Sequence, residues 1–402
     1  MTSPGRTEKL PVQAKRNCSV CGSNAKKPLF QQRFSTMLLV QGYTVVVCGN
    51  CGFAYADDIP EQDAFDAYYR DLSKYEYEHH GGRGSEHDEA RLRETAEVLS
   101  KSVPGPQSRI LEIGSSTGRL LAFLKERGFP NVWGVDPSPS CAQAARRLYG
   151  VPVLATSLSG LAESREKFDF VIMVGVLEHI RDLHGALATI HQILSAKGRV
   201  YLDVPDATQF ADWPDAPFQE FSTEHINFFS RCSLVNLMQV HGFRCVSSEK
   251  AQRGYTETTV IPSVQATFED SPAAPRGWTR DKETEVRLLE YIRQSQTVDT
   301  RVRQIIDRAA IGKPIIVWGV GTHTQRLLAD GGLDKADICL FVDSNPKYHG
   351  QKLRGISIVP PGSLKQRTEP ILISSRVFQR EIQGQIRDQL RLKNELLLLY
   401  DV

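Results

Sequence analysis

The chain has 402 residues, which at roughly 150 residues per domain suggests two or three domains. Lys and Arg number 49 and Asp and Glu number 47, so the formal net charge is only +2, which argues against nucleic acid or an anionic membrane as the main partner. The longest apolar runs, such as residues 170–176, are far shorter than the roughly 18 residues of a membrane span. The first 15 residues carry no apolar secretion signal, so we expect a cytoplasmic protein.

The 8 cysteines support the same compartment, because they are unevenly placed. Four fall between Cys18 and Cys51, and the other four are scattered singly. A secreted chain that depends on disulfides is usually smaller and more evenly cross-linked, whereas a chain of this length can bury a large core without them. The first four cysteines therefore need another explanation.

These four cysteines form two CxxC pairs, Cys18 with Cys21 and Cys48 with Cys51, each followed by a glycine and separated by 26 residues. A CxxC pair lets two thiolates bind one ion, and the glycine relieves the turn. The alternating stretch at 44–47 predicts a hairpin between the pairs. We predict a four-cysteine zinc site, which is structural because it has no open coordination position. Free or disulfide-linked cysteines are the alternative, and DNA binding is disfavoured because no basic stripe lies between the pairs.

From residue 109 the pattern changes to strands alternating with helices. Residues 109–113 predict a strand, 114–118 a glycine loop, 119–127 a helix and 131–136 a second strand that ends in an aspartate. A doubly wound sheet holds nucleotide-like ligands in this way, because glycines let the ligand approach the backbone and an acid at a strand end accepts the ribose hydroxyls.

The loop is not the dinucleotide GxGxxG, because Glu112 lies inside the strand before Gly114 and Gly118. This E-x-G-x-x-x-G form resembles class I S-adenosylmethionine-dependent methyltransferases, and the "FD-V…LEH" stretch at 168–179 supports the resemblance. It implies S-adenosyl-L-methionine as cofactor, with the acid helping to place the methionine amino group. The residues expected to bind the cofactor are Glu112, Gly114, Ser115, Gly118, Asp136, Pro137 and Gly175.

Two Glu-His pairs are candidates for the reaction centre. Glu178-His179 follows the fourth strand in methyltransferases of many substrates, which favours a role in orienting the loop over catalysis. Glu224-His225 lies among aromatic residues before a helix for which Ser230 is the predicted N-cap, where such sheets open onto the substrate. His225 titrates near neutrality and can remove a proton, while Glu224 orients it or stabilises its charged form. A merely packed histidine is the alternative.

The whole chain resembles the three-domain sugar C-methyltransferases, which act on nucleotide-linked keto-deoxysugars. The resemblance implies a zinc-binding domain with a lid segment at 1–85, a methyltransferase domain at 86–255, and a C-terminal Rossmann-like domain at 270–402 with a long helix before its sheet. The family motif Y-H-E-H, an aromatic pair and Ser is fitted here by Glu224, His225, Phe228, Phe229 and Ser230. By resemblance, His225 abstracts the proton alpha to the ketone and the enolate attacks the methyl group, without help from zinc.

This sequence departs from the family at Ser222 and Thr223, where the family has Tyr and His. The change removes a phenol that could assist at the ketone oxygen. The segment 68–80 resembles the tyrosine-bearing lid of the family, so Tyr77 is a candidate catalytic hydroxyl and Tyr75 a candidate substrate contact. Tyrosines that only pack are the alternative.

A second strand–glycine loop–helix pattern lies at 313–324, with Gly319 and Gly321, and a following strand ends in Asp343. It resembles the last domain of the family, although His323 stands where the family carries a lysine. Because a helix N-terminus binds anions, we expect weak substrate contacts from Gly319, Gly321 and His323. Apolar residues at helical spacing over 288–309 predict a long packing helix between domains rather than a coiled coil.

The hypothesis is therefore an α/β S-adenosylmethionine-dependent methyltransferase whose small-molecule substrate is a nucleotide sugar, with C-methylation in deoxysugar biosynthesis as its specific form. O-methylation of a sugar or another hydroxylated metabolite, with His225 deprotonating a hydroxyl, is the alternative. A non-catalytic cofactor-binding protein is disfavoured because the acids and His225 are all present. Neither nucleic acid nor a membrane is expected as a partner, and the sequence leaves monomer and homodimer open.

Overall fold

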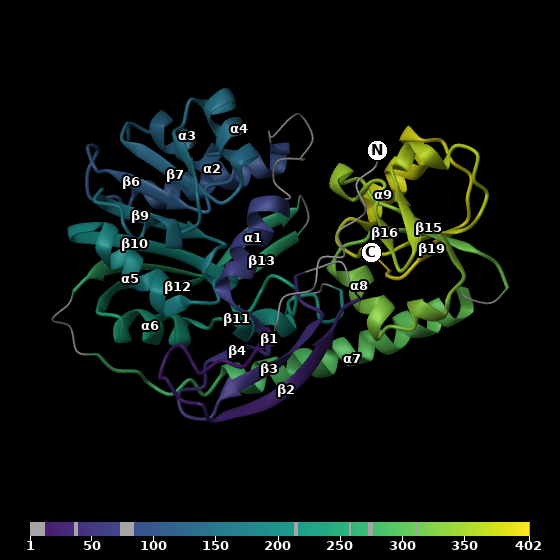
Figure 1. The fold of residues 1–402 in the computed structure, drawn as a ribbon, viewed down its shortest axis with the longest axis horizontal. Helices are drawn as coiled ribbons and strands as arrows, with labels where there is room; N and C mark the ends of the chain where they lie inside the picture. Colours follow the sequence, from purple (N-terminus) through teal and green to yellow (C-terminus); the bar gives the residue numbers. More distant parts are fainter. Residues whose placement is uncertain are drawn as a thin grey trace, which may run out of the picture.

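The computed structural model describes residues 13–35, 39–72, 84–212, 216–256, 259–271, 276–309 and 312–401. Over these ranges it has three large sheets, one in each third of the chain, and a small two-stranded sheet. Figure 1 shows the central sheet and the C-terminal sheet on opposite sides, with the N-terminal strands and helix α7 below them. Among the described helices, none combines the length and the apolar character needed to span a membrane.

The N-terminal sheet is antiparallel with the order β11-β4-β3-β2. Its strands are β2 (Lys26–Arg33), β3 (Gly42–Cys48), β4 (Ala54–Asp57) and β11 (Asn227–Phe228). Strands β2 and β3 form the hairpin predicted between the cysteine pairs. Strand β11 comes from the middle of the chain and begins two residues after His225, so the sheet includes part of the candidate site. The short strands β1 (Gln13–Ala14) and β5 (Ile59–Pro60) pair with each other, and helix α1 (Gln62–Leu72) follows.

The central sheet has seven strands in the order β12-β13-β10-β9-β6-β7-β8. The strands from β10 to β8 are parallel, whereas β13 and β12 run antiparallel at the edge. The strands are β6 (Ile110–Ile113), β7 (Val132–Asp136), β8 (Val153–Ala155), β9 (Phe168–Val174), β10 (Leu194–Pro205), β12 (Phe243–Thr256) and β13 (Thr259–Asp270). The helices are α2 (Glu86–Ser100), α3 (Arg119–Glu126), α4 (Pro139–Tyr149), α5 (Leu183–Ile193) and α6 (Arg231–Val240). This mixed α/β sheet confirms the expected class I methyltransferase fold.

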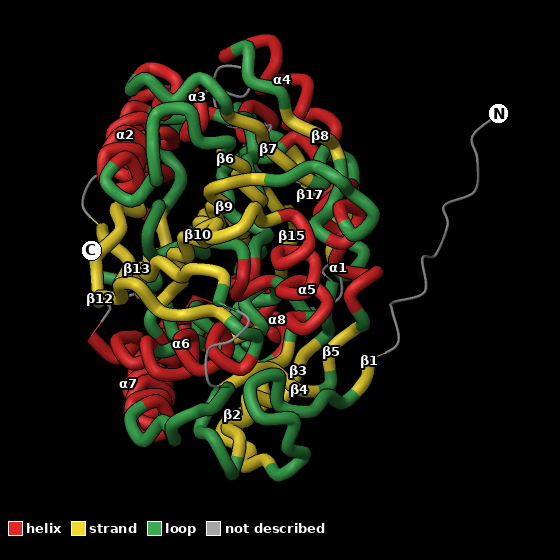
Figure 2. Tube along the Cα trace, turned by 90° about the vertical axis from the view of Figure 1, so that its left-hand side faces the viewer, coloured by secondary structure: helices red, strands yellow, loops and turns green. Residues whose placement is uncertain are grey.

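Strand β9 shows why the sheet is covered on both faces. Its residues 170–173 are fully buried apolar side chains, as expected for a strand inside a mostly parallel sheet. Because successive side chains point to opposite faces, Val171 and Met173 join the cluster with α5 and α6, whereas Phe170 and Ile172 join the cluster with α2 and α3. Figure 2 shows the helices on either side of these strands.

The C-terminal sheet has the order β16-β17-β15-β14-β18-β19, and the pairs from β17 to β19 are parallel. Its strands are β14 (Ile315–Trp318), β15 (Ile338–Val342), β16 (Lys352–Leu353), β17 (Ile356–Val359), β18 (Ile371–Ile373) and β19 (Leu396–Leu398). Helices α8 (Thr322–Ala329) and α9 (Gln379–Gly384) accompany it. The sheet is mostly parallel, in agreement with the expected Rossmann-like unit.

Helix α7 (Thr284–Ala309) is the predicted long helix, about 39 Å for its 26 residues. Leu288 and Ile292 pack into the cluster around the N-terminal sheet, and Val302 and Ile306 pack into the C-terminal core. The helix therefore joins two cores, as its expected role as a packing helix required.

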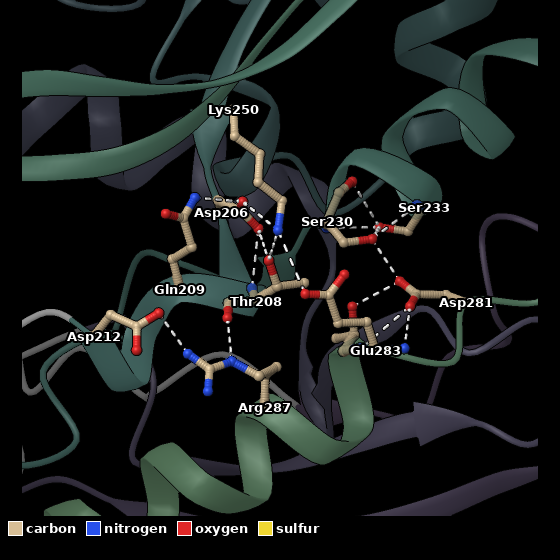
Figure 3. A network of polar contacts seen from close by, with 11 residues as sticks. Asp206, Thr208, Gln209, Asp212, Ser230, Ser233, Lys250, Asp281, Glu283 and Arg287 are labelled. Carbon is tan, nitrogen blue, oxygen red and sulfur yellow. Dashed lines mark hydrogen bonds and ion pairs between the residues drawn. The ribbon is translucent and has the colours of Figure 1, made fainter.

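A polar network fixes the start of α7 (Figure 3). Asp281 accepts hydrogen bonds from the hydroxyls of Ser230 and Thr284, and its own N–H donates to the carbonyl of Cys51 at 2.8 Å. Gly52 has φ +83°, and a Cβ there would lie 2.2 Å from the Asp281 carbonyl oxygen, so this turn requires glycine. The second cysteine pair is thus tied directly to α7 and to the beginning of α6.

Candidate active site

The first glycine loop follows β6 at the carboxyl end of the parallel strands. Gly114 and Gly118 both have φ +73°, a conformation that favours glycine. A Cβ at Gly114 would lie 2.5 Å from Cγ2 of Val176, in the turn after β9. Gly175, the first residue of that turn, has φ +67°. The backbone of the loop therefore lies directly against the turn that leads to His179. Neither Gly114 nor Gly118 tolerates a side chain.

Two acids lie beside this loop. Asp136 accepts the backbone N–H of Ser116 on one carboxylate oxygen at 2.8 Å and that of Ser138 on the other at 2.9 Å. Glu112 is buried, and within the described residues its Oε2 has no hydrogen-bond partner. Burial, followed by the charge of Asp136, raises the pKa of Glu112 to about 8. A buried carboxylate of this kind suits a cationic donor, because an unpaired charge in the interior is costly.

The remaining predicted cofactor residues lie around the same loop. Ser115 is buried, and its hydroxyl oxygen would lie 2.3 Å from a Cβ at Gly134, so its position depends on that glycine in β7. Pro137 follows Asp136 at the end of β7, and Ser138 caps α4. The structure thus brings all seven predicted cofactor residues to one edge of the sheet.

His225 lies at the start of the segment that becomes β11. Its Nδ1 is 4.0 Å from Oε2 of Glu220, and its side chain is 27% exposed whereas that of Glu220 is 8% exposed. Its ring meets the ring of His179 edge to face, with centroids 5.0 Å apart. The hydroxyl of Ser222 accepts the backbone N–H of His225 at 3.0 Å, so Ser222 shapes the turn that presents the imidazole.

Glu224 faces a second group of residues, from helix α1 and from the turn after β9. Its Oε1 accepts a hydrogen bond from the Tyr68 hydroxyl at 3.1 Å. Its backbone carbonyl lies 2.9 Å from Nδ1 of His179, which is also 3.0 Å from the Tyr69 hydroxyl. Helix α1 and the turn after β9 thus both hold the Glu224-His225 segment.

Arg16 anchors the same segment to the N-terminal sheet from the other side. Its guanidinium donates to the carbonyls of Ala56 and Ile226 and to Oδ1 of Asn227. The side chain is buried, and burial, with the nearby charge of Arg181, lowers its pKa to about 9. Arg16 lies two residues before Cys18, and it bonds Ile226, the residue after His225. One buried cation therefore connects the cysteine pairs with the segment that carries His225.

The four cysteines of the two CxxC pairs converge as the sequence predicts. The Sγ atoms of Cys18 and Cys51 are 3.4 Å apart, as are those of Cys21 and Cys48, and all four lie within 4.8 Å of one another. A hydrogen bond from Cys51 is the main cause that lowers the pKa of Cys18 to about 6, whereas burial raises the pKa of Cys21 to about 11. Four sulfurs at these distances form a donor set suited to tetrahedral zinc.

The second glycine loop is arranged differently. Gly319 has φ +104°, and Gly321 is the N-cap of α8. His323 is buried, and its Nε2 hydrogen-bonds the hydroxyl of Tyr400 at 2.6 Å. Burial lowers the pKa of His323 well below its usual value, so the ring is neutral. The expected substrate contacts of these three residues stay predictions. Tyr75, the other expected substrate contact, and Tyr77, the candidate catalytic hydroxyl, lie outside the described residues.

Comparisons with known proteins agree with this geometry. Residues 85–248 match the family model of a methyltransferase domain, and residues 312–395 match a model described as C2185-like, N-terminal. The chain is an S-adenosylmethionine-dependent methyltransferase. It is 25% identical over 325 residues to the C-methyltransferase NovU of Streptomyces niveus, which covers 78% of this chain and 74% of that protein.

Other relatives match a smaller share of the chain. The ubiquinone biosynthesis O-methyltransferase of Rhizobium etli is 30% identical over 123 residues, 29% of this chain and 48% of that protein. The solved 1,6-didemethyltoxoflavin-N1-methyltransferase of Burkholderia thailandensis covers 56% of this chain and 96% of its own, with 23% identity and a TM-score of 0.41.

Three residues next to Glu224 or His225 are not among the predicted site residues: Glu220, Tyr68 and His179, the last of which was expected only to orient its loop. Glu220 belongs to no sequence motif, and it lies five positions before His225. The turn at Ser222 brings its carboxylate close to the imidazole ring of His225. Tyr68 belongs to the tyrosine-rich stretch that the sequence singled out, but that stretch gives no indication that its partner is Glu224. The contact between the rings of His179 and His225 joins the two Glu-His pairs, which the sequence places 46 residues apart.

Proposed function

We propose that this methyltransferase adds a methyl group to a carbon of a nucleotide-linked keto-deoxysugar, with His225 as the general base. The observation that carries the proposal is the placement of His225, partly exposed next to the glycine-loop edge of the sheet and backed by the buried carboxylate of Glu220. The similarity to a C-methyltransferase over 78% of the chain supports transfer of the methyl group to carbon.

S-adenosylmethionine would supply an electrophilic methyl group. Glu112 and Asp136 would hold it, since a buried carboxylate suits its ammonium group and Asp136 retains acceptor capacity for ribose hydroxyls beside its two backbone bonds. A ring nitrogen of His225 would take the proton from the carbon alpha to the ketone. Glu220, 4.0 Å from Nδ1, would stabilise the imidazolium that forms.

Glu224 has a positioning role in this proposal. Its carboxylate accepts from Tyr68 and its carbonyl contacts His179, so it holds the turn rather than the reacting atoms. Ser222, in place of the family tyrosine, uses its hydroxyl to accept the backbone N–H groups of Glu224 and His225. The hydroxyl therefore shapes the loop.

The absence of a tyrosine at position 222 also favours O-methylation as a second candidate, with His225 deprotonating a hydroxyl. Solvent exchange separates the two reactions. A nucleoside-diphosphate 4-keto-6-deoxysugar is incubated in D₂O with the enzyme and S-adenosylhomocysteine, and deuterium at the alpha carbon is followed by NMR. The proposal expects exchange by the wild type and none by His225→Ala.

The product then identifies the bond. With a ¹³C-methyl cofactor, a C-linked methyl group and an O-linked one give separate carbon resonances. An O-methyl product formed without any alpha exchange would contradict C-methylation and establish the alternative.

We also propose that the four-cysteine cluster holds one structural zinc ion. Its four thiolates would complete a closed tetrahedral shell, with no open position for substrate. Its contribution would be to hold the sheet in which β11 continues from His225.

A further inference from the structure

Glu178, His179 and His225 form a cluster, here called the Glu-His-His cluster, that the reaction scheme above uses only at His225. One ligand atom from each residue lies within 4.8 Å of the other two. Two imidazoles and one carboxylate on one side of an ion are the ligand set with which proteins bind divalent transition metals while leaving open positions. Glu178 and His179 come from the turn after β9, which begins at Gly175, and His225 comes from the segment just before β11.

The carboxylate of Glu178 is placed as a metal ligand would be. The side chain is 2% exposed, its Oε1 is 3.8 Å from Nε2 of His179, and among the described residues its Oε2 has no hydrogen-bond partner. A buried carboxylate oxygen without a partner is costly unless a cation or a donor reaches it. Burial raises the pKa of Glu178, although the nearby charges of His179 and Arg253 act in the opposite direction. Arg253 also forms an ion pair with Asp203 at 3.6 Å.

His179 has the support that metal-binding histidines usually have. Its Nδ1 lies 2.9 Å from the Glu224 carbonyl, and a carbonyl can only accept, so this contact requires an Nδ1–H. The neutral ring then carries its lone pair on Nε2, which is the atom nearest Glu178. A backbone carbonyl that fixes the tautomer in this way is the usual outer partner of a histidine ligand.

The distances leave room for an ion. Zinc binds imidazole nitrogen and carboxylate oxygen at about 2.0–2.2 Å, so two ligands in a tetrahedral site lie about 3.4 Å apart. The separation of 3.8 Å between His179 and Glu178 is close to that value. Ligand atoms at the upper limit of 4.8 Å would come within coordination distance if the side chains rotated and each ligand atom moved by about 1 Å.

We propose that the Glu-His-His cluster binds a divalent transition metal ion of the zinc or cobalt type, and that the bound ion inhibits methyl transfer. Coordination by His225 uses the lone pair that proton abstraction requires, so metal and proton compete for one nitrogen. The inhibition rests on the proposed role of His225 as base, whereas the binding does not.

The test uses full-length protein whose cysteine cluster is loaded with zinc, and Co²⁺ as the probe. We expect one additional Co²⁺ per chain, with the visible absorption of nitrogen and oxygen ligation and without thiolate charge-transfer bands. Glu178→Gln and His179→Asn should each weaken binding on the order of 10- to 100-fold or more. His184→Asn, a change at an exposed histidine on α5, is the matched control and should bind as the wild type does.

Methyl transfer is then measured against the same Co²⁺ titration. Inhibition with a midpoint equal to the binding constant, weakened in Glu178→Gln, is the expected result. Absence of thiolate-free Co²⁺ binding, or equal binding by Glu178→Gln, would overturn the site and leave the proposed function untouched. Binding at the cluster without inhibition would overturn the inhibitory effect and would remove His225 as the base.

Discussion

Asp136 ends β7 and Asp343 directly follows β15, the second strands of the two strand–glycine loop–helix units, and the two aspartates make similar hydrogen bonds. Asp136 accepts the N–H of Ser116, which lies in its glycine loop. It also accepts the N–H of Ser138, two positions after Asp136 itself. Asp343 accepts the N–H of Val320, one residue after the first glycine of its loop, at 2.9 Å and that of Asn345 at 2.8 Å. In both units an aspartate thus binds the glycine loop through a backbone N–H, although the loop position differs by one residue.

The side chains around the two turns differ. Two residues before its first glycine, the first unit has the buried acid Glu112, whereas the second has Val317, which is fully buried. In the second unit Thr324 donates to the Gly319 carbonyl at 2.7 Å and Gln325 donates to the Val320 carbonyl at 3.1 Å. Two carbonyls of the second loop accept hydrogen bonds from its own helix, while the first unit has a buried acid with an unpartnered oxygen among the described residues. A shared backbone motif therefore does not imply a shared ligand.

Among the changes that test this comparison, the largest effect on kcat is expected at His225, the histidine beside the first unit. His225→Ala should lower kcat by on the order of 10²- to 10⁴-fold, because general-base catalysis is lost. Cofactor affinity by calorimetry should stay near the wild type, since His225 is not one of the predicted cofactor residues. His349→Gln in the second unit, where His349 contacts the Asp343 carbonyl, is the control and should keep kcat. Equal losses in both variants would contradict the assignment.

Next in size is the effect of the metal module. Cys48→Ser should remove the zinc and lower Tm by roughly 10 °C or more, because structural zinc contributes several kcal/mol to folding. Metal analysis and thermal unfolding measure both quantities. Cys339→Ser in the C-terminal unit should keep one zinc per chain. A folded protein without stoichiometric zinc would contradict the proposed site.

Glu112 should make cofactor binding depend on pH. Its pKa of about 8 means that it is protonated in the ligand-free protein at neutral pH, while the ammonium group of the cofactor favours the carboxylate. Affinity should therefore rise as the pH increases from about 6.5 to 8.5, a window around that value. Glu112→Gln should bind about 10- to 100-fold more weakly with a flatter profile, since a bond to a charged group contributes about 1.5–3 kcal/mol.

The same group sets a stability trend with a definite sign. In the unfolded chain Glu112 loses its proton near its ordinary pKa of 4.5, whereas in the ligand-free fold it holds the proton up to about 8. The fold therefore loses stability as the pH rises between these values, and Glu112→Gln should remove that slope. Urea unfolding at pH 5.5 and 7.5 measures it, and identical slopes for both proteins would exclude Glu112 as its source.

The smallest effect is expected inside the second unit. Thr324→Val removes the bonds from its hydroxyl to the Gly319 carbonyl and to Ser374. It should cost about 0.5–1.5 kcal/mol per bond in unfolding free energy. Cofactor affinity should not change, because the predicted cofactor residues do not include Thr324. A loss of cofactor affinity would show that the two units are coupled.

Features encoded by neighbouring residues were predictable from the sequence. The strand before the first glycine loop, the helix beginning at Arg119 and the Ser230 cap appear at or within a residue of their expected positions, and a strand precedes the second loop as expected. The Ser230 hydroxyl accepts the Ser233 N–H at 3.0 Å. The two cysteine pairs also lie together as predicted, because two CxxC pairs at this spacing commonly form one four-cysteine site. These features depend on turns, caps and alternation over a few residues.

Features that depend on distant partners were not predictable. Arg16 reaches Ile226 across 210 positions, and β11 pairs with β4 although the two strands come from different parts of the chain. The neighbours of His225 in the structure include Glu220 and His179, whereas the sequence motif suggested Glu224 alone. Such contacts are decided when the sheets pack together, and a pattern in one stretch of sequence does not contain them.

The pairing of β11 with β4 has a consequence for how this chain can be recombined. An excised core that begins near residue 85 would leave β11 without its neighbouring strand, and would also lose the buried guanidinium of Arg16. A chimera that exchanges the N-terminal module between relatives must therefore carry the segment around 220–230 along with it. The reaction centre therefore depends on two segments that are separate in the sequence and have to be exchanged together.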